Sequence, residues 1–193
     1  MAESLQVDSI SMQKITLRSK IFEYLNLIGA TIFIFAPILY SEIYLATNSD
    51  YGSHITWARD IFASPQNVPA SVIAHASWQW LVLFIRQIMN RTWNESAFVI
   101  TLGSVIATSG ILFWLLRKKL SPLLSGALSL GLMIAAPVFL VEPFENIWYF
   151  VNGYIGPNVY HNPTILLLKP FAILQFYFVI EAFNVEKTNW QTY

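Results

Sequence analysis

A long, almost unbroken apolar segment occupies residues 21–45 of the chain. Roughly 20 apolar residues in a helix cross the hydrocarbon core of a bilayer, so this segment is long enough to span a membrane. Pro37 lies inside it and is expected to kink the helix. Segments of similar character follow at residues 97–116, 122–141 and 164–183. The sequence therefore predicts an all-α integral membrane protein with about four transmembrane helices.

The composition supports the same class. Of the 193 residues, 55% are hydrophobic and 11% are charged, whereas a soluble domain has about 25% charged residues. Lysine plus arginine equals aspartate plus glutamate at 11 each, and no basic run is interleaved with aromatic residues, so nucleic acid is excluded as a partner. Cysteine is absent, which excludes disulfides, thiolate metal sites and a cysteine nucleophile.

The basic residues orient the apolar segments. Lys14, Arg18 and Lys20 precede the first segment, and a basic cluster at residues 117–119 follows the second. Because basic residues beside spans favour the cytoplasm, we expect a multi-pass protein with both termini cytoplasmic. The expected organisation is an N-terminal segment at 1–20, one transmembrane helical domain at 21–184 with outer segments at 46–96 and 142–163, and a cytoplasmic tail at 185–193.

A further apolar segment at residues 70–89 is expected to lie on the membrane and not to cross it. If it crossed, the basic cluster at 117–119 would be outside, against the charge bias that sets topology. Polar residues interrupt the segment, and its tryptophans are typical of the headgroup region. These residues are His75, Gln79, Arg86, Gln87, Trp78 and Trp80. The pattern predicts an interfacial helix on the outer face.

The first outer segment holds a carboxylate and an imidazole four residues apart, Asp50 and His54. In a helix these two side chains share a face. Such a pair is suited to acid–base catalysis because each charge alters the pKa of the other group. In the structural alternative, which the spacing alone favours, Asp50 caps the helix and His54 rests among the headgroups. Asp50 and His54 are the candidate catalytic residues.

The second outer segment ends in a run of turn-forming residues, 153–163, directly before the last span. This composition predicts a loop from which Tyr160, His161 and Asn162 can face a membrane-embedded ligand. The alternative is an aromatic belt at the interface. Lys169 is an ionisable residue near the outer end of the last span, where it suits a lipid phosphate or snorkels to the headgroups. We expect these four residues to bind substrate.

The outer histidines and carboxylates leave a divalent metal open as a cofactor. No two of them have the tight spacing of a zinc motif, so no metal ligand is assigned. The sequence also contains no phosphate-cradling glycine loop and no serine–histidine–aspartate pattern with a nucleophile elbow.

Together these features resemble the N-terminal part of the GT-C superfamily of membrane glycosyltransferases. In that family the first helix leads into a large outer loop with an acidic residue near its start, followed by membrane-parallel helices. Asp50, in the stretch Ser49 to His54, takes the acidic position, and residues 69–90 resemble the parallel helix, with His75 near its beginning as a substrate-binding candidate. The resemblance implies that Asp50 is the base for the acceptor hydroxyl or amine. It also implies a polyprenyl-phosphate sugar as the donor.

GT-C enzymes usually have more spans than this chain. The resemblance therefore implies an N-terminal half with a missing C-terminal half, one half of a split enzyme, or a small relative without catalysis. A different class of function stays open: a noncatalytic small subunit of a larger photosynthetic, respiratory or transport complex, with further membrane subunits as partners. No histidine lies inside a predicted span, which argues against ligation of haem or pigment within the helices.

Overall fold

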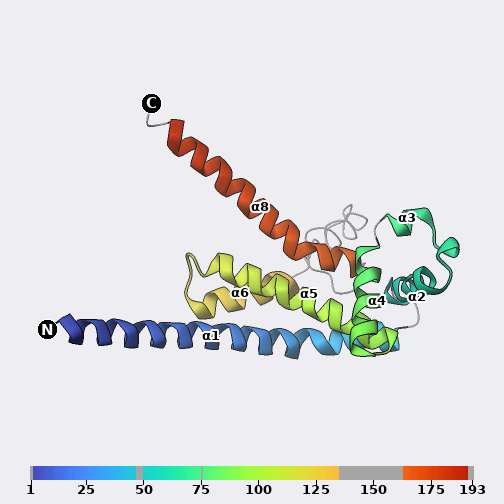
Figure 1. Ribbon diagram of the computed structural model, residues 1–193, viewed down its shortest axis with the longest axis horizontal. Coiled ribbons are helices and arrows are strands. Elements are labelled where there is room, and N and C mark those ends of the chain that lie inside the picture. The colour runs from blue at the N-terminus through green and yellow to red at the C-terminus, as the bar shows by residue number, and fades with distance from the viewer. Residues whose placement is uncertain (1, 47–49, 75, 135–162, 191–193) are drawn as a thin grey trace, which may run out of the picture.

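The computed structural model describes residues 2–46, 50–74, 76–134 and 163–190, and every regular element in these ranges is a helix. Four long or apolar helices form a bundle, and a group of shorter helices covers one end of it (Figure 1). The bundle consists of α1 (Ala2–Tyr40) with its π-helical extension η1 (Ser41–Leu45), α5 (Trp93–Leu116), α6 (Pro122–Ile134) and α8 (Pro163–Trp190). We call the shorter group the cap: α2 (Asp50–Ala63), η2 (Pro65–Asn67), α3 (Ala70–Ile73) and α4 (Ser77–Met89).

Three helices are long and apolar enough to cross a membrane: Leu17–Leu45, Trp93–Leu116 and Pro163–Phe183. The all-helical class is therefore confirmed for the described residues, and these three helices are candidate spans of a membrane protein. The described part of the fourth predicted span is α6, whose 13 residues are roughly 20 Å long. That length is less than the hydrocarbon core of about 30 Å, and the remainder of the predicted span, 135–141, lies outside the described residues.

Helix α5 is the centre of the bundle. It contacts α1, α6 and α8, and it runs antiparallel to both α1 and α6 (Figure 1). Pro37 does not end α1, which continues to Tyr40 before the backbone changes to the π-helical turn. Proline has no backbone N–H to donate, so the regular α-helical hydrogen bonding is interrupted near Pro37. The π-helical turn that follows is the local distortion of the helix.

Small hydroxyl side chains join α1 to α5 inside the bundle. The Thr31 and Ser109 hydroxyl oxygens are 3.0 Å apart, and both residues are buried. One of the two hydroxyls donates to the other, and the second donates to a carbonyl of its own helix, either Thr31 to Leu27 at 2.7 Å or Ser109 to Ile106 at 3.0 Å. Each hydroxyl is therefore satisfied without water, which is the requirement for polar side chains within a lipid-surrounded bundle.

The end of the bundle opposite the cap carries charged contacts. Arg117 donates to both carboxylate oxygens of Glu23, at 2.9 and 3.3 Å, which ties the end of α5 to α1. Lys118 places its ammonium group 4.2 Å from the Trp114 ring centroid and 4.0 Å from that of Tyr177, and it hydrogen-bonds the Tyr177 hydroxyl. Arg117 and Lys118 of the basic cluster therefore connect α5 to α1 and to α8 at this end.

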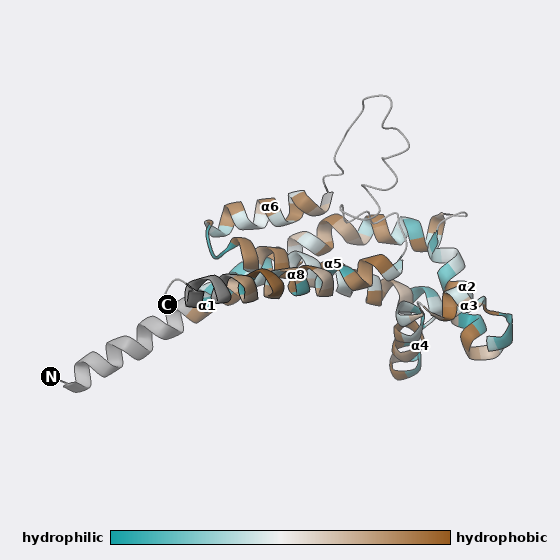
Figure 2. Ribbon diagram, turned by 90° about the horizontal axis from the view of Figure 1, so that it is seen from above, coloured by the Kyte–Doolittle hydropathy of each residue, from teal (hydrophilic) through white to brown (hydrophobic). Residues whose placement is uncertain are grey.

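The cap lies where α1 ends and α5 begins, and α4 runs crosswise to both helices in Figures 1 and 2. Hydrophilic residues gather in the cap and in the turn between α5 and α6 (Figure 2). The prediction of one continuous helix over residues 69–90 is wrong, because the structure has two helices there, α3 and α4. At Ala76 the ψ angle is 12°, so the backbone leaves the α-helical region and the chain changes direction before α4.

Helix α4 is apolar on two faces. Trp78 and Val82 are fully buried against the bundle, whereas Trp80, Phe84 and Ile88 are more than half exposed. The exposed three recur every four residues and so form one stripe along the helix. One apolar face of α4 is therefore packed on the bundle, and the other is exposed in the part of the chain that the structure describes.

Candidate functional site

Asp50 is the first residue of α2 and is exposed. A carboxylate at this position is stabilised by the partial positive charge of the helix N-terminus. Its neighbours Gly52 and Ser53 are also exposed, so the carboxylate stands on an open surface of the cap. This exposure allows Asp50 to meet a ligand as well as to stabilise its own helix.

His54 lies one turn further along α2, and its ring is buried, with 7% exposed. Its Nδ1 is 2.7 Å from Nε2 of Gln79 on α4. An amide nitrogen can only donate, so Nδ1 is the acceptor in this contact. The rings of Trp57 and Trp78 meet His54 edge-to-face at 4.8 and 6.0 Å. His54 is therefore held in one orientation by contacts from α2 and α4.

Burial and charge act in opposite directions on His54. Burial lowers the pKa of the imidazole, and the nearby Asp50 carboxylate raises it by a smaller amount. The net pKa is below the ordinary value, so the ring stays neutral near neutral pH. Asp50 therefore lies one helical turn from a neutral, oriented histidine and not from a cationic one.

The lowered pKa of His54 predicts that acid destabilises the cap. In the unfolded chain the histidine binds a proton at higher pH than in the folded protein, so stability is full above about pH 6.5 and falls as the pH drops through the folded pKa. We expect limited proteolysis of the cap to be faster at about pH 5 than at about pH 7.5. His54→Asn should reduce that pH difference, and an unchanged difference in this variant would assign the effect to other groups.

Two buried aromatic residues anchor the cap on α5. Tyr51 and Trp78 are both 0% exposed, and their rings meet edge-to-face at 6.4 Å. The Trp78 indole donates to the Thr101 hydroxyl at 3.3 Å, and the Thr101 side chain also hydrogen-bonds Tyr51. Burial raises the pKa of Tyr51, which stays protonated. Because α2, α4 and α5 meet at Thr101, this packing fixes the position of α2. It therefore also fixes the position of Asp50, the first residue of that helix.

The structure describes some of the predicted substrate-binding residues and not others. Lys169 is half-buried on α8, and α8 contacts both α2 and α4. The remaining predicted residues, His75, Tyr160, His161 and Asn162, lie outside the described residues. Within the described ranges, no three histidine or carboxylate side chains come together as metal ligands.

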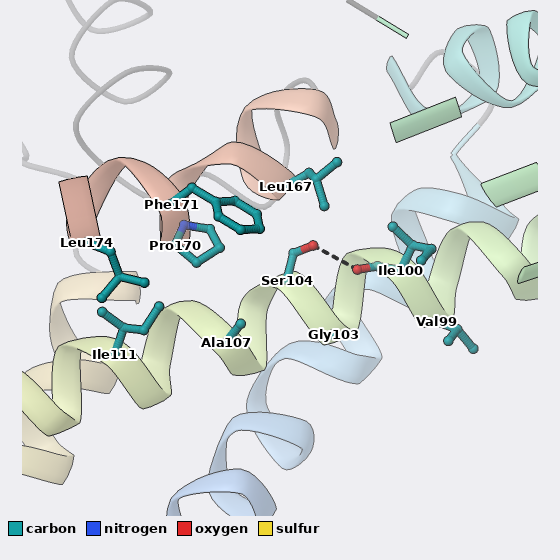
Figure 3. Close-up of a pocket in the computed structure, with 10 residues that line it drawn as sticks. All are labelled: Val99, Ile100, Gly103, Ser104, Ala107, Ile111, Leu167, Pro170, Phe171 and Leu174. Atoms are coloured by element: carbon teal, nitrogen blue, oxygen red, sulfur yellow. Dashed lines mark hydrogen bonds between the residues drawn. The ribbon is translucent and has the colours of Figure 1, made fainter. Parts of the chain in front are cut away.

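An apolar groove that the sequence did not indicate runs between α5 and α8 (Figure 3). Its volume is about 330 Å³. Small residues of α5, Gly103 and Ala107, face Leu167 and Phe171 of α8 across it. The Ser104 hydroxyl in the lining donates to the Ile100 carbonyl at 2.8 Å. With its polar group satisfied, the groove suits a hydrocarbon chain.

Comparison of the chain with protein-family models, with curated proteins and with solved structures found no match.

Proposed function

We propose that the protein is a GT-C-like membrane glycosyltransferase, or the N-terminal half of one, that uses a polyprenyl-phosphate sugar on the non-cytoplasmic face. The observation that carries the proposal is the exposed Asp50 carboxylate at the start of a cap helix, beside the end of the first span. This position agrees with that of the acidic residue in the GT-C superfamily, which the sequence resembles. His54 and Gln79 support it by holding the first turns of α2 against α4.

In the proposed reaction, Asp50 accepts the proton of an acceptor hydroxyl or amine. The acceptor oxygen or nitrogen then forms a bond to the anomeric carbon of the donor sugar. The bond between that carbon and the phosphate oxygen breaks, and polyprenyl phosphate leaves as the anion. His54 is neutral and buried, so its contribution is to position Asp50 through α2.

The groove between α5 and α8 supports a lipid-linked donor. It is apolar and lies on two of the candidate spans, so a polyprenyl chain can enter it from the membrane. Lys169 lies beside Pro170 of the lining, in the same half of α8. We assign Lys169 to the donor phosphate, together with the predicted loop residues Tyr160, His161 and Asn162.

The proposal includes four spans with both termini in the cytoplasm. The directions of the bundle helices support this topology, because α1 and α6 run toward the cap end and α5 runs away from it (Figure 1). The basic cluster at 117–119 is at the opposite end from the cap. The charge bias of membrane insertion then places the cap outside.

A direct test is sugar transfer by the purified protein in nanodiscs. We expect transfer of radiolabelled mannose or glucose from a polyprenyl-phosphate donor, and none from the corresponding nucleotide sugar. The competing candidate is a noncatalytic subunit, which the large exposed apolar residues of α8, such as Phe171, Phe176 and Phe178, favour. Absence of transfer from every lipid-linked donor, with stable copurification of other membrane chains, would favour the subunit.

A further inference from the structure

A second cavity lies between the cap and the first turn of α5. Its volume is about 420 Å³. Four elements contribute to it: η1, α2, α4 and the N-terminal turn of α5. The lining residues are Tyr44, Arg59, Arg86, Thr92, Trp93 and Asn94. It shares no lining residue with the groove between α5 and α8.

The depth of this cavity is defined by the candidate spans. Tyr44 is next to the last residue of the span Leu17–Leu45, and Trp93 is the first residue of the span Trp93–Leu116. The cavity therefore lies where hydrocarbon gives way to headgroups. Tyrosine and tryptophan are also the aromatic residues enriched at that depth.

Two guanidinium groups line the cavity, and neither forms an ion pair with another residue that the structure describes. Across the described ranges, the salt bridges are Arg91–Glu95 and Arg117–Glu23, and neither includes Arg59 or Arg86. The carboxylate in the first turn of α5, Glu95, is already engaged. Its Oε2 accepts from the Thr92 backbone N–H at 2.9 Å and from the Thr92 hydroxyl at 3.0 Å, and its Oε1 is 3.9 Å from Arg91.

Arg86 is held in position for a ligand. Its guanidinium carbon is 4.6 Å from the centroid of the Trp93 ring, which restrains the planar group. The Arg86 Nε is buried and has no hydrogen-bond acceptor among the residues that the structure describes. A guanidinium group that lines a cavity and is restrained in this way can present its positive charge to an anion bound there.

We infer that this cavity, which we call the arginine site, binds the phosphate group of a membrane lipid in the leaflet on the cap side. Two arginines match the charge and the oxygen geometry of a phosphate monoester. The location at headgroup depth selects a lipid over a soluble phosphate compound. The site does not depend on the proposed sugar transfer, so binding here and catalysis at Asp50 are tested separately.

The test measures binding to the full chain in detergent, with dihexanoyl phosphatidic acid, dihexanoyl phosphatidylcholine and inorganic phosphate as probes. We expect phosphatidic acid to bind most tightly. Arg59→Gln and Arg86→Gln should each weaken its binding by about tenfold or more, because each removes a charged donor to the phosphate. Arg91→Gln is the matched control, since Arg91 is nearby and exposed but is not part of the lining, and it should leave the affinity unchanged.

Three outcomes would overturn the inference: equal weakening by Arg91→Gln, equal affinity for phosphatidylcholine, or inorganic phosphate binding as tightly as phosphatidic acid. The last would identify a free phosphate as the ligand. Arg59 is exposed on α2, so Arg59→Gln is expected to fold even if loss of the Arg86–Trp93 contact harms the other variant. Arg86→Lys keeps the charge without the planar fork, and it should restore part of the affinity.

Discussion

Asp50→Asn is expected to lower the rate of sugar transfer by at least about 100-fold, because general base catalysis typically contributes a factor of this size or more. Asparagine has nearly the same shape as aspartate but cannot accept the acceptor's proton at neutral pH. It is also an accepted residue at the start of a helix, so α2 should keep its fold. The measurement is the initial rate of transfer from a polyprenyl-phosphate sugar in nanodiscs.

The control for this variant is Asp60→Asn on the same helix. Asp60 lies near the other end of α2, two and a half turns or more from Asp50, and the substitution removes the same charge. It should leave the rate within about twofold of the wild type. If Asp50→Asn retained most of the transfer activity while Asp60→Asn behaved identically, Asp50 would be a structural residue and the proposed base would be wrong.

Trp78→Ala is expected to detach the cap from α5, with a cost of about 3–5 kcal/mol in the stability of the cap. Trp78 is 0% exposed, and its indole donates to Thr101 at 3.3 Å. Its ring also meets those of Tyr51 and His54. Truncation removes these contacts together and leaves a cavity where α2, α4 and α5 meet.

Trp80→Ala is the matched control, since it removes the same side chain two residues away on the same helix. Trp80 is 56% exposed, so its loss should cost less than about 1 kcal/mol in detergent. Hydrogen exchange of α2 and α4 measures the difference. Similar exchange rates in the two variants would mean that α4 does not pack on the bundle through Trp78.

The apolar pattern predicted the three helices that are candidate spans, because a helix that crosses lipid needs a continuous apolar segment. The predicted span 97–116 is part of α5, which begins earlier, at Trp93. The sequence explains this earlier start. Thr92 and Glu95 form a capping box, in which the Thr92 side chain accepts from the Glu95 N–H and the Glu95 carboxylate accepts from the Thr92 N–H. This pattern of threonine followed three residues later by glutamate is visible in the sequence.

The candidate site was less predictable than the bundle. Spacing placed Asp50 and His54 on one helix, and both are on α2. It did not reveal that His54 is buried against Gln79, which is 25 residues away in the chain, because pairing between helices depends on tertiary packing. For the same reason the sequence indicated neither the groove between α5 and α8 nor the arginine site, since each combines residues from helices that are distant in the sequence.

The central claim is that the cap and the basic cluster lie on opposite sides of the membrane, with the cap outside. The chain has no cysteine, so single cysteines can be labelled without background. Ser53 in the cap and Lys119 after α5 are both exposed positions. In intact cells, a membrane-impermeant maleimide should label the Ser53→Cys variant at once and the Lys119→Cys variant only after lysis. Labelling of Lys119→Cys from outside, with Ser53→Cys protected until lysis, would contradict the account.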